Sequence, residues 1–126
     1  MADTPNREPR DFDHEINGKG MYVMPGFVDM HVHGSGRGKA PDLSYSYKLW
    51  LAHGVTTVRG VSLTGAEVAS SEKNRSAKNE IAAPRIINYQ TLGSGWPGGP
   101  VNTVEKAREW VRWAAANNID GIKFFN

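Results

Sequence analysis

The chain has 126 residues, with 15 Lys and Arg against 13 Asp and Glu, a net charge of +2, and no Cys. This length predicts one domain, and it is too short to close a (β/α)8 barrel, which takes about 250 residues or roughly 200 at the least. The absence of Cys excludes a disulfide framework, a thiolate zinc site and a cysteine nucleophile.

The basic residues are scattered and form no run interleaved with aromatic residues, which argues against nucleic-acid binding. The apolar runs are too short for a transmembrane helix, and the first residues lack the apolar stretch of a signal peptide. We therefore expect a cytoplasmic protein with no membrane contact.

Strand-like and helix-like segments alternate along the chain. Residues 1–20 are polar and contain Pro and Gly, which predicts an N-terminal arm. β-branched and aromatic residues predict four strands, at 27–33, 55–59, 85–89 and 121–125. Between them, residues 44–53, residues 65–82 and a segment that starts after Asn102 are expected to be helical.

Local signals set the ends of two of these helices. Gly54 predicts the end of the first helix, and Asn102 with Glu105 resembles a capping box at the start of the third. The third helix is expected to turn an apolar stripe toward the core, with two Trp side chains packing beside it. The stripe is Val104, Ala107, Val111, Ala114 and Ala115, and the flanking residues are Trp110 and Trp113.

This alternation predicts an α/β fold with a parallel sheet, because parallel strands need helical crossovers. Such sheets are usually buried on both faces. The pattern alone fits two architectures, an open four-stranded sheet and half of a (β/α)8 barrel, and it does not separate them.

His31 and His33 are two residues apart on the first predicted strand, and Asp29 precedes them on the same face. Two imidazoles this close can share one metal ion, and zinc prefers nitrogen ligands. The alternative interpretation is an exposed strand edge or two core histidines that hydrogen-bond elsewhere.

Lys123 lies within the fourth predicted strand, between apolar neighbours. A lysine in a buried strand is rare, and desolvation favours its neutral amine. A neutral amine can act as a base, form a Schiff base, or react with carbon dioxide to give a carbamate that bridges two metal ions. Alternatively, the strand end is solvated and the amine reaches water.

Other polar residues carry weaker signals. His14 and His53 are interpreted as solvated or structural, and Ser94 as a loop residue without a neighbouring base. The loop at 34–38 does not match a phosphate-binding spacing, so we expect it to lie on the substrate side.

Residues 22–34, with a Pro-Gly turn, Asp29 and the His-x-His of His31 and His33, resemble the first barrel strand of the metal-dependent amidohydrolase superfamily. Residues 51–59 and 84–86 resemble its second and third strands. Residues 119–123, with Lys123, resemble the fourth strand in the branch that includes imidazolonepropionase-like enzymes and prolidase-type dipeptidases.

The resemblance implies an α/β fold of the (β/α)8 TIM-barrel type with only the first four βα units present. Residues 1–20 would be an arm left from a β-sandwich region, and residues 21–126 the N-terminal half of the barrel. It further implies one or two Zn²⁺ or other divalent ions, with His31 and His33 as ligands and Lys123 as a carboxylated, bridging ligand. In the complete protein, metal-bound hydroxide would cleave an amide, a cyclic amide, another non-peptide C–N bond or a dipeptide.

The chain lacks the superfamily's later metal ligands and its catalytic Asp, and Gly60 stands where relatives often have Asp. We therefore expect the isolated chain, as a fragment, to be inactive, and we assign no catalytic residue. Two alternatives remain open: a half-barrel that associates with another copy of itself or with a partner through its open sheet edges, and a non-catalytic domain that binds metal or is purely structural.

Overall fold

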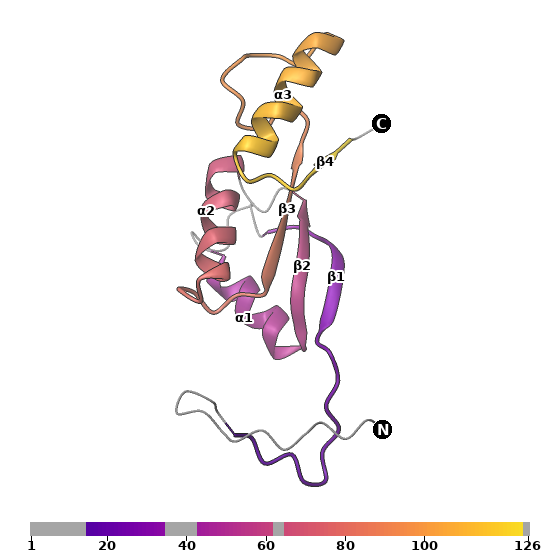
Figure 1. Cartoon of the computed structure of the whole chain (residues 1–126), viewed down its shortest axis with the longest axis vertical. Coiled ribbons are helices and arrows are strands. Elements are labelled where there is room, and N and C mark those ends of the chain that lie inside the picture. Colours follow the sequence, from indigo (N-terminus) through magenta and orange to yellow (C-terminus); the bar gives the residue numbers. More distant parts are fainter. Residues whose placement is uncertain (1–14, 35–42, 62–64, 125–126) are drawn as a thin grey trace, which may run out of the picture.

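The computed structural model describes residues 15–34, 43–61 and 65–124. Four strands alternate with three helices along this part of the chain, in the order that the sequence predicts (Figure 1). The strands are β1 (Phe27–Val32), β2 (Val55–Val61), β3 (Arg85–Thr91) and β4 (Gly121–Lys123), and the helices are α1 (Ser44–Ala52), α2 (Ala66–Ala77) and α3 (Val104–Ala116).

The strands form one parallel sheet in the order β1-β2-β3-β4. The pairing of β2 with β3 is regular, and Val58 lies opposite Ile86. The pairing of β1 with β2 is irregular on both sides of Val28 and Asp29, so that three steps along β1, from Asp29 to Val32, match two steps along β2. Such an irregularity bends a strand and changes the direction of its side chains.

The predicted (β/α)8 TIM-barrel-type fold is wrong for this chain, although the α/β class is confirmed. The described residues form a small α/β domain with an open half-barrel of four strands, in which β1 and β4 each have only one neighbouring strand. They hold three helices, and α3 extends beyond the end of the sheet in Figure 1. A helix of a TIM barrel would instead take its place in a ring around the strands.

The helices cover one face of the sheet, so the expectation that both faces are buried is also wrong. Val58 and Ile86 on this covered face are buried against Tyr47 of α1. On the opposite side, which we call the open face, the described residues include no helix. The covered face therefore holds the core, and the open face meets solvent.

Helix α3 packs differently from the prediction. Its N-cap is Thr103, whose hydroxyl oxygen accepts a hydrogen bond from the Lys106 N–H at 3.2 Å, so the predicted cap at Asn102 is off by one residue. Val104 and Val111 of the predicted stripe are exposed, whereas Trp110 is completely buried. The large indole area outweighs the apolar stripe of smaller residues because burial energy scales with area.

A second cluster holds α3 in place. It joins the buried residues Ala66, Trp110, Ala114 and Ile119, with partly buried apolar residues of the 92–101 loop packed against them. The Trp110 Nε1–H donates to the Ser94 carbonyl oxygen at 3.4 Å. Helix α3 is thus attached to the start of α2 and to this loop.

Left-handed backbone follows each of the three helices of the described residues, and after α3 the residue is Asn118, with φ 65°. Gly54 has φ +77° directly after α1, as the predicted C-terminal signal requires. Helix α2 stops at Ala77, earlier than expected, and Asn79 adopts φ 58° in the turn that follows. Strand β4 ends at Lys123, and the predicted strand residue Phe125 lies outside the described residues.

Polar side chains form a chain of hydrogen bonds on the covered face of β3. Asn88 and Gln90 are almost fully buried. The Gln90 Nε2–H donates to Asn88 Oδ1 at 2.8 Å, and the Asn88 Nδ2–H donates to Ser70 Oγ at 3.2 Å. Buried amides are costly unless they are paired, so this network fixes β3 against α2.

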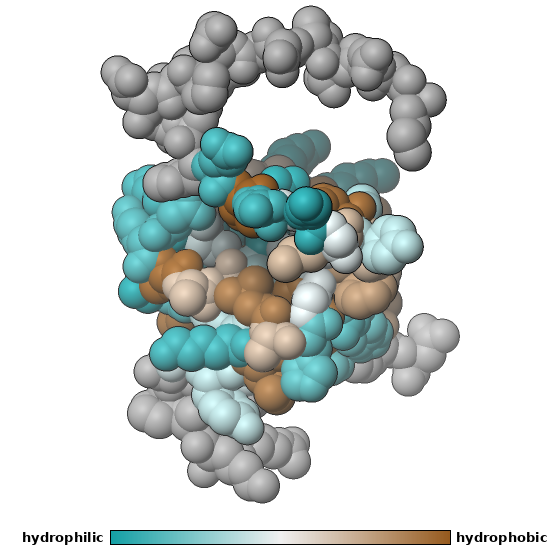
Figure 2. Space-filling model, turned by 90° about the horizontal axis from the view of Figure 1, so that it is seen from below, coloured by the Kyte–Doolittle hydropathy of each residue, from teal (hydrophilic) through white to brown (hydrophobic). Residues whose placement is uncertain are grey.

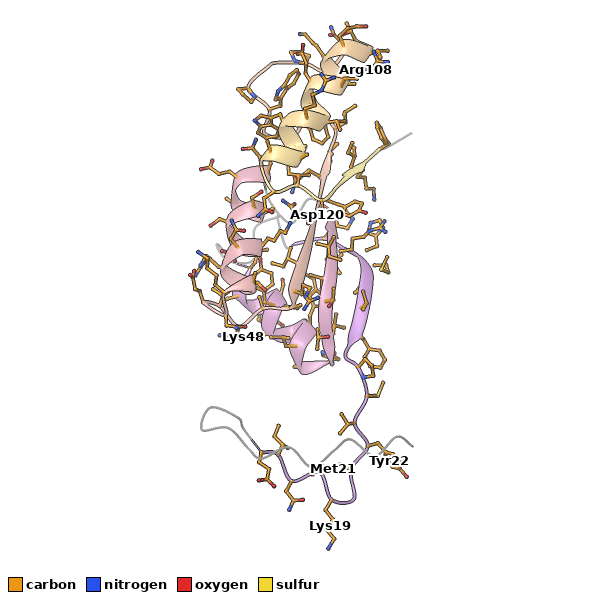
Figure 3. The ribbon with its side chains drawn as sticks, viewed as in Figure 1. Lys19, Met21, Tyr22, Lys48, Arg108 and Asp120 are labelled. Atoms are coloured by element: carbon orange, nitrogen blue, oxygen red, sulfur yellow. The ribbon has the colours of Figure 1, made fainter. Side chains whose placement is uncertain are left out.

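Asp120, labelled in Figure 3, connects β3 to the start of β4. Its Oδ2 accepts the Asn88 backbone N–H at 2.7 Å, and its own backbone N–H donates to the Asn88 carbonyl oxygen at 2.8 Å. Its Oδ1 forms an ion pair with Lys73 Nζ at 2.7 Å. One carboxylate therefore joins α2, β3 and β4.

The segment around Met21 and Tyr22 lies apart from the sheet (Figure 3). Figure 3 labels Met21 and Tyr22 on the segment that runs below the strands, and both side chains are exposed. Apolar side chains also reach the surface between polar ones when the molecule is seen from below (Figure 2). In the described part of the chain, no helix has the length and apolar character needed to cross a membrane. Residues 1–14 of the predicted arm lie outside the described residues.

We predict that Asp120→Ala lowers the free energy of unfolding by about 1–3 kcal/mol, because it removes the partner of a part-buried backbone N–H. Urea unfolding followed by circular dichroism measures this change. Glu109→Ala, at an exposed position of α3, is the control and should change stability by less than about 0.5 kcal/mol. Equal stability of the two variants would contradict a structural role for the Asp120 carboxylate.

Tyr47 makes the free energy of unfolding depend on pH in the alkaline range. Its side chain is 1% exposed, and its hydroxyl oxygen has no hydrogen-bond partner. Burial, and then the nearby Glu72 carboxylate, raise the pKa of Tyr47 above its ordinary value of 10.0. Below pH 10 the folded and unfolded chains both keep the phenolic proton. Above it the unfolded chain releases this proton first, so stability falls as the pH rises.

We predict that Tyr47→Phe removes this loss. Between about pH 9 and about pH 11, the wild-type chain should lose more unfolding free energy than the variant, with a limiting slope of about 1.4 kcal/mol per pH unit. Urea midpoints at each pH provide the measurement. Tyr45→Phe, on the exposed side of the same helix, should behave as wild type. The interpretation fails if Tyr47→Phe and wild type lose stability in parallel.

Candidate metal centre

The two predicted histidine ligands lie together at the carboxyl end of β1. Val32 points into the core, so His31 and His33 on either side of it share the open face. Their Nε2 atoms are 3.0 Å apart, and their ring centroids are 5.1 Å apart. Both side chains are exposed, so solvent reaches the pair.

Lys123 comes from the opposite edge of the sheet. Its Nζ lies 3.1 Å from His31 Nε2, and the residue is half-buried. Neighbouring strands are about 4.8 Å apart, so three strand spacings in a flat sheet separate β1 from β4 by roughly 14 Å. The contact therefore requires a curled sheet whose open face is concave, with the long lysine side chain reaching across it.

The chemistry of these three nitrogens fits a bound cation. A neutral imidazole Nε2 has either one lone pair or one N–H, yet two other nitrogens lie within hydrogen-bond distance of His31 Nε2. One hydrogen bond can form there, but not two. A zinc ion accepts lone pairs from several nitrogens, and tetrahedral ligands about 2.0–2.1 Å from it are roughly 3.3 Å apart. The observed spacing is close to this arrangement.

Carboxylate side chains contribute little to the candidate metal centre. Asp29 Oδ1 accepts the His31 backbone N–H at 3.0 Å and so is turned toward its own strand. Among residues 15–34, 43–61 and 65–124, no group of three or more His, Cys, Asp or Glu side chains comes together. The candidate centre therefore rests on two imidazoles and one amine, with Lys123 as the third donor.

The open face also holds a residue that the sequence analysis did not single out. Arg59 of β2 lies with its guanidinium carbon 4.5 Å from the centre of the Tyr89 ring on β3. A Cβ on Gly121 of β4 would clash with this ring, so the glycine leaves room for it. The signal in the sequence was a charged residue alternating with apolar ones on a β-branched strand.

The remaining polar candidates have structural places. His53 caps the end of α1, and its Nδ1 is 2.8 Å from the Leu49 carbonyl oxygen. Ser94 lies in a loop, as predicted, and its hydroxyl donates to Gln90 Oε1 at 3.1 Å. His14 and residues 35–38 of the expected substrate-side loop lie outside the described residues.

Two hollows lie away from the three nitrogens. One, of about 1020 Å³, is lined by residues that include Pro25, Thr56 and Arg85 near the amino ends of the strands. The other, of about 700 Å³, lies between α2 and α3 beside Trp113. None of His31, His33 and Lys123 lines either of these two hollows.

Comparison with known proteins finds no matching family model, no matching curated protein and no matching solved structure. The similarity to amidohydrolases therefore stays a prediction from the motifs.

Proposed function

We propose that His31, His33 and Lys123 hold a divalent metal ion, preferably Zn²⁺, as part of a hydrolase site of the amidohydrolase type. The observation that supports this most directly is the approach of two nitrogens to His31 Nε2, which has room for a single hydrogen bond. Catalytic zinc sites commonly have three protein ligands and one open position, and the exposed pair leaves such a position toward solvent.

When bound, a divalent ion in such a site polarises a carbonyl oxygen and lowers the pKa of water to about 7. The residues of this chain position the ion and leave the substrate side open. His31 and His33 are held by the end of β1, and the Asp29 carboxylate fixes the strand just before them by accepting the His31 N–H. Lys123 supplies the third donor, either as a neutral amine or as a carbamate.

The proposed substrate is a small molecule with an amide, a cyclic amide or a related C–N bond, and the proposed compartment is the cytoplasm. Hydrolysis needs further groups, because no carboxylate and no third imidazole of the described residues joins the three nitrogens. The direct test of this chain is therefore its metal binding.

We predict that the chain, stripped with a chelator and dialysed, binds Zn²⁺, and that His31→Ala and His33→Ala each weaken binding at least about ten-fold, equivalent to 1.4 kcal/mol. Competition with a chromophoric chelator measures the affinity. His53→Ala removes an exposed imidazole at the end of α1 and should bind zinc as wild type does. Equal affinities across all four proteins would show that any bound zinc sits elsewhere.

A second candidate is association between two copies of the chain. Strand β1 is an edge of the sheet, and three apolar side chains along it, Phe27, Val28 and Met30, are exposed. Unpaired edges with apolar side chains favour strand addition. Sedimentation velocity over a range of concentrations is expected to show a dimer that dissociates on dilution, and a monomer at every concentration would contradict it.

A further inference from the structure

A positive charge with no ion-pair partner among the described residues lies on the open face beside the candidate metal centre. Arg59 pairs in register with Ile87, so it shares a face with Tyr89 two residues further along β3. Tyr89 pairs with Gly121, and Lys123 is two residues beyond, so Lys123 points to this face as well. The register alone therefore places the guanidinium, the phenol ring and the lysine amine on one concave surface.

The same reasoning brings the histidines to this surface. Asp29 pairs with Val58 and Val32 with Gly60, so the β1 segment that carries His31 runs beside Arg59 on β2. The contact between Lys123 Nζ and His31 Nε2, at 3.1 Å, connects the two edge strands across this surface. Arg59 lies among these groups and not at the rim of the domain.

The hydrogen-bonding groups of Arg59 are incompletely paired in this position. Its Nε is buried and has no hydrogen-bond partner, and none of the ion pairs among the described residues includes it. The Asp29 carboxylate, which belongs to the neighbouring strand, accepts the His31 N–H. The Tyr89 ring stabilises the guanidinium from one side through a cation–π contact, which does not neutralise its charge.

These features describe a site for an anion. A half-buried guanidinium without a counter-ion is costly to keep, and a planar, fixed guanidinium matches the two oxygens of a carboxylate. Because Nε is enclosed, the ligand would meet the outer, terminal nitrogens. A single arginine balances a single negative charge, which favours a carboxylate over a phosphate.

We propose that Arg59, held by Tyr89, binds the carboxylate of the substrate, so that the proposed amide substrate carries an acidic group a few atoms from the bond at the metal centre. Arg59 is then a specificity residue. That the bound carboxylate belongs to a substrate rests on the proposed function. Carboxylate binding by Arg59 does not rest on it, because the guanidinium is in place without a metal ion.

The test compares two small amides of nearly equal size, N-acetylglycine and its uncharged analogue N-acetylglycinamide, in buffer with EDTA. Binding is followed by changes in the amide ¹H–¹⁵N spectrum of the full chain. We expect N-acetylglycine to bind with a millimolar dissociation constant and to move the signals of β2 and β3. The uncharged analogue should bind at least about ten-fold more weakly.

Substitutions of arginine identify the residue that binds the carboxylate. Arg59→Gln should reduce N-acetylglycine binding to the level of the uncharged analogue, and Arg59→Lys should restore part of it, since it keeps the charge but loses the planar fork. Arg85→Gln removes an exposed arginine at the other end of β3 and should have no effect. Circular dichroism confirms that each variant is folded.

The proposal is overturned if wild type binds both amides equally or neither, if Arg59→Gln binds N-acetylglycine as wild type does, or if inorganic phosphate binds more tightly than N-acetylglycine. The comparison of the two amides needs no variant, so it decides the question even if Arg59→Gln does not fold. Because EDTA is present throughout, a failure of zinc binding would leave the result unchanged, and the two proposals are tested separately.

Discussion

The position of β4 depends on a reciprocal pairing between Asn88 and Asp120. The backbone of Asp120 donates to the Asn88 carbonyl, and the Asp120 carboxylate accepts the Asn88 N–H. Strand β4 has only three residues and one neighbouring strand, so its own ladder holds it weakly. The carboxylate, also paired with Lys73, compensates for this. Three residues later Lys123 reaches His31, and that contact exists only while the start of β4 is held in register.

The one-sided covering of the sheet explains why polar chemistry gathers where it does. Helices α1 and α2 bury Val58, Ile86 and the amides of β3 on one face. The alternation of strands then sends their neighbours, Arg59 and Tyr89 among them, to the other face. With no helix of the described residues on that side, solvent reaches the histidines and most of the polar side chains there, although the Arg59 Nε is enclosed. Curling brings the ends of β1 and β4 close enough for their side chains to meet.

The sequence predicted the elements of this fold well because their signals are local. β-branched runs marked all four strands, and the φ of +77° at Gly54 agrees with the helix end predicted there. The burial of α3 was predicted in part: Ala114 of the expected stripe is buried, but Val104 and Val111 are exposed. The larger area of Trp110 decided the orientation. The expectation of a TIM-barrel-type half failed for a related reason. Periodicity reports which face of an element is apolar, and it does not report how many strands pair or what covers the second face.

The candidate site also has one part that local sequence signals predicted and another part that they did not. The sequence placed His31 and His33 on one face because a spacing of two does so in any strand. The contact of Lys123 with His31 spans 92 positions of the chain and depends on sheet curvature, which no local pattern encodes. Arg59 escaped notice because a charged residue in a strand is ordinarily a solvated one. Its significance comes from the Tyr89 ring and from the missing counter-ion, both of which require the register of three strands.

Charge balance links the two proposed ligands of the open face. A divalent cation bound by Lys123 as a neutral amine adds two positive charges beside the Arg59 guanidinium, and like charges at this range oppose one another. A carbamate on Lys123 adds a negative charge next to the cation, and a carboxylate on Arg59 balances the guanidinium. The cation and the carboxylate are therefore expected to favour each other's binding, by the same factor in each direction, because coupling free energies are reciprocal. On this view Arg59 selects acidic substrates and also lowers the electrostatic cost of holding the metal while such a substrate is bound.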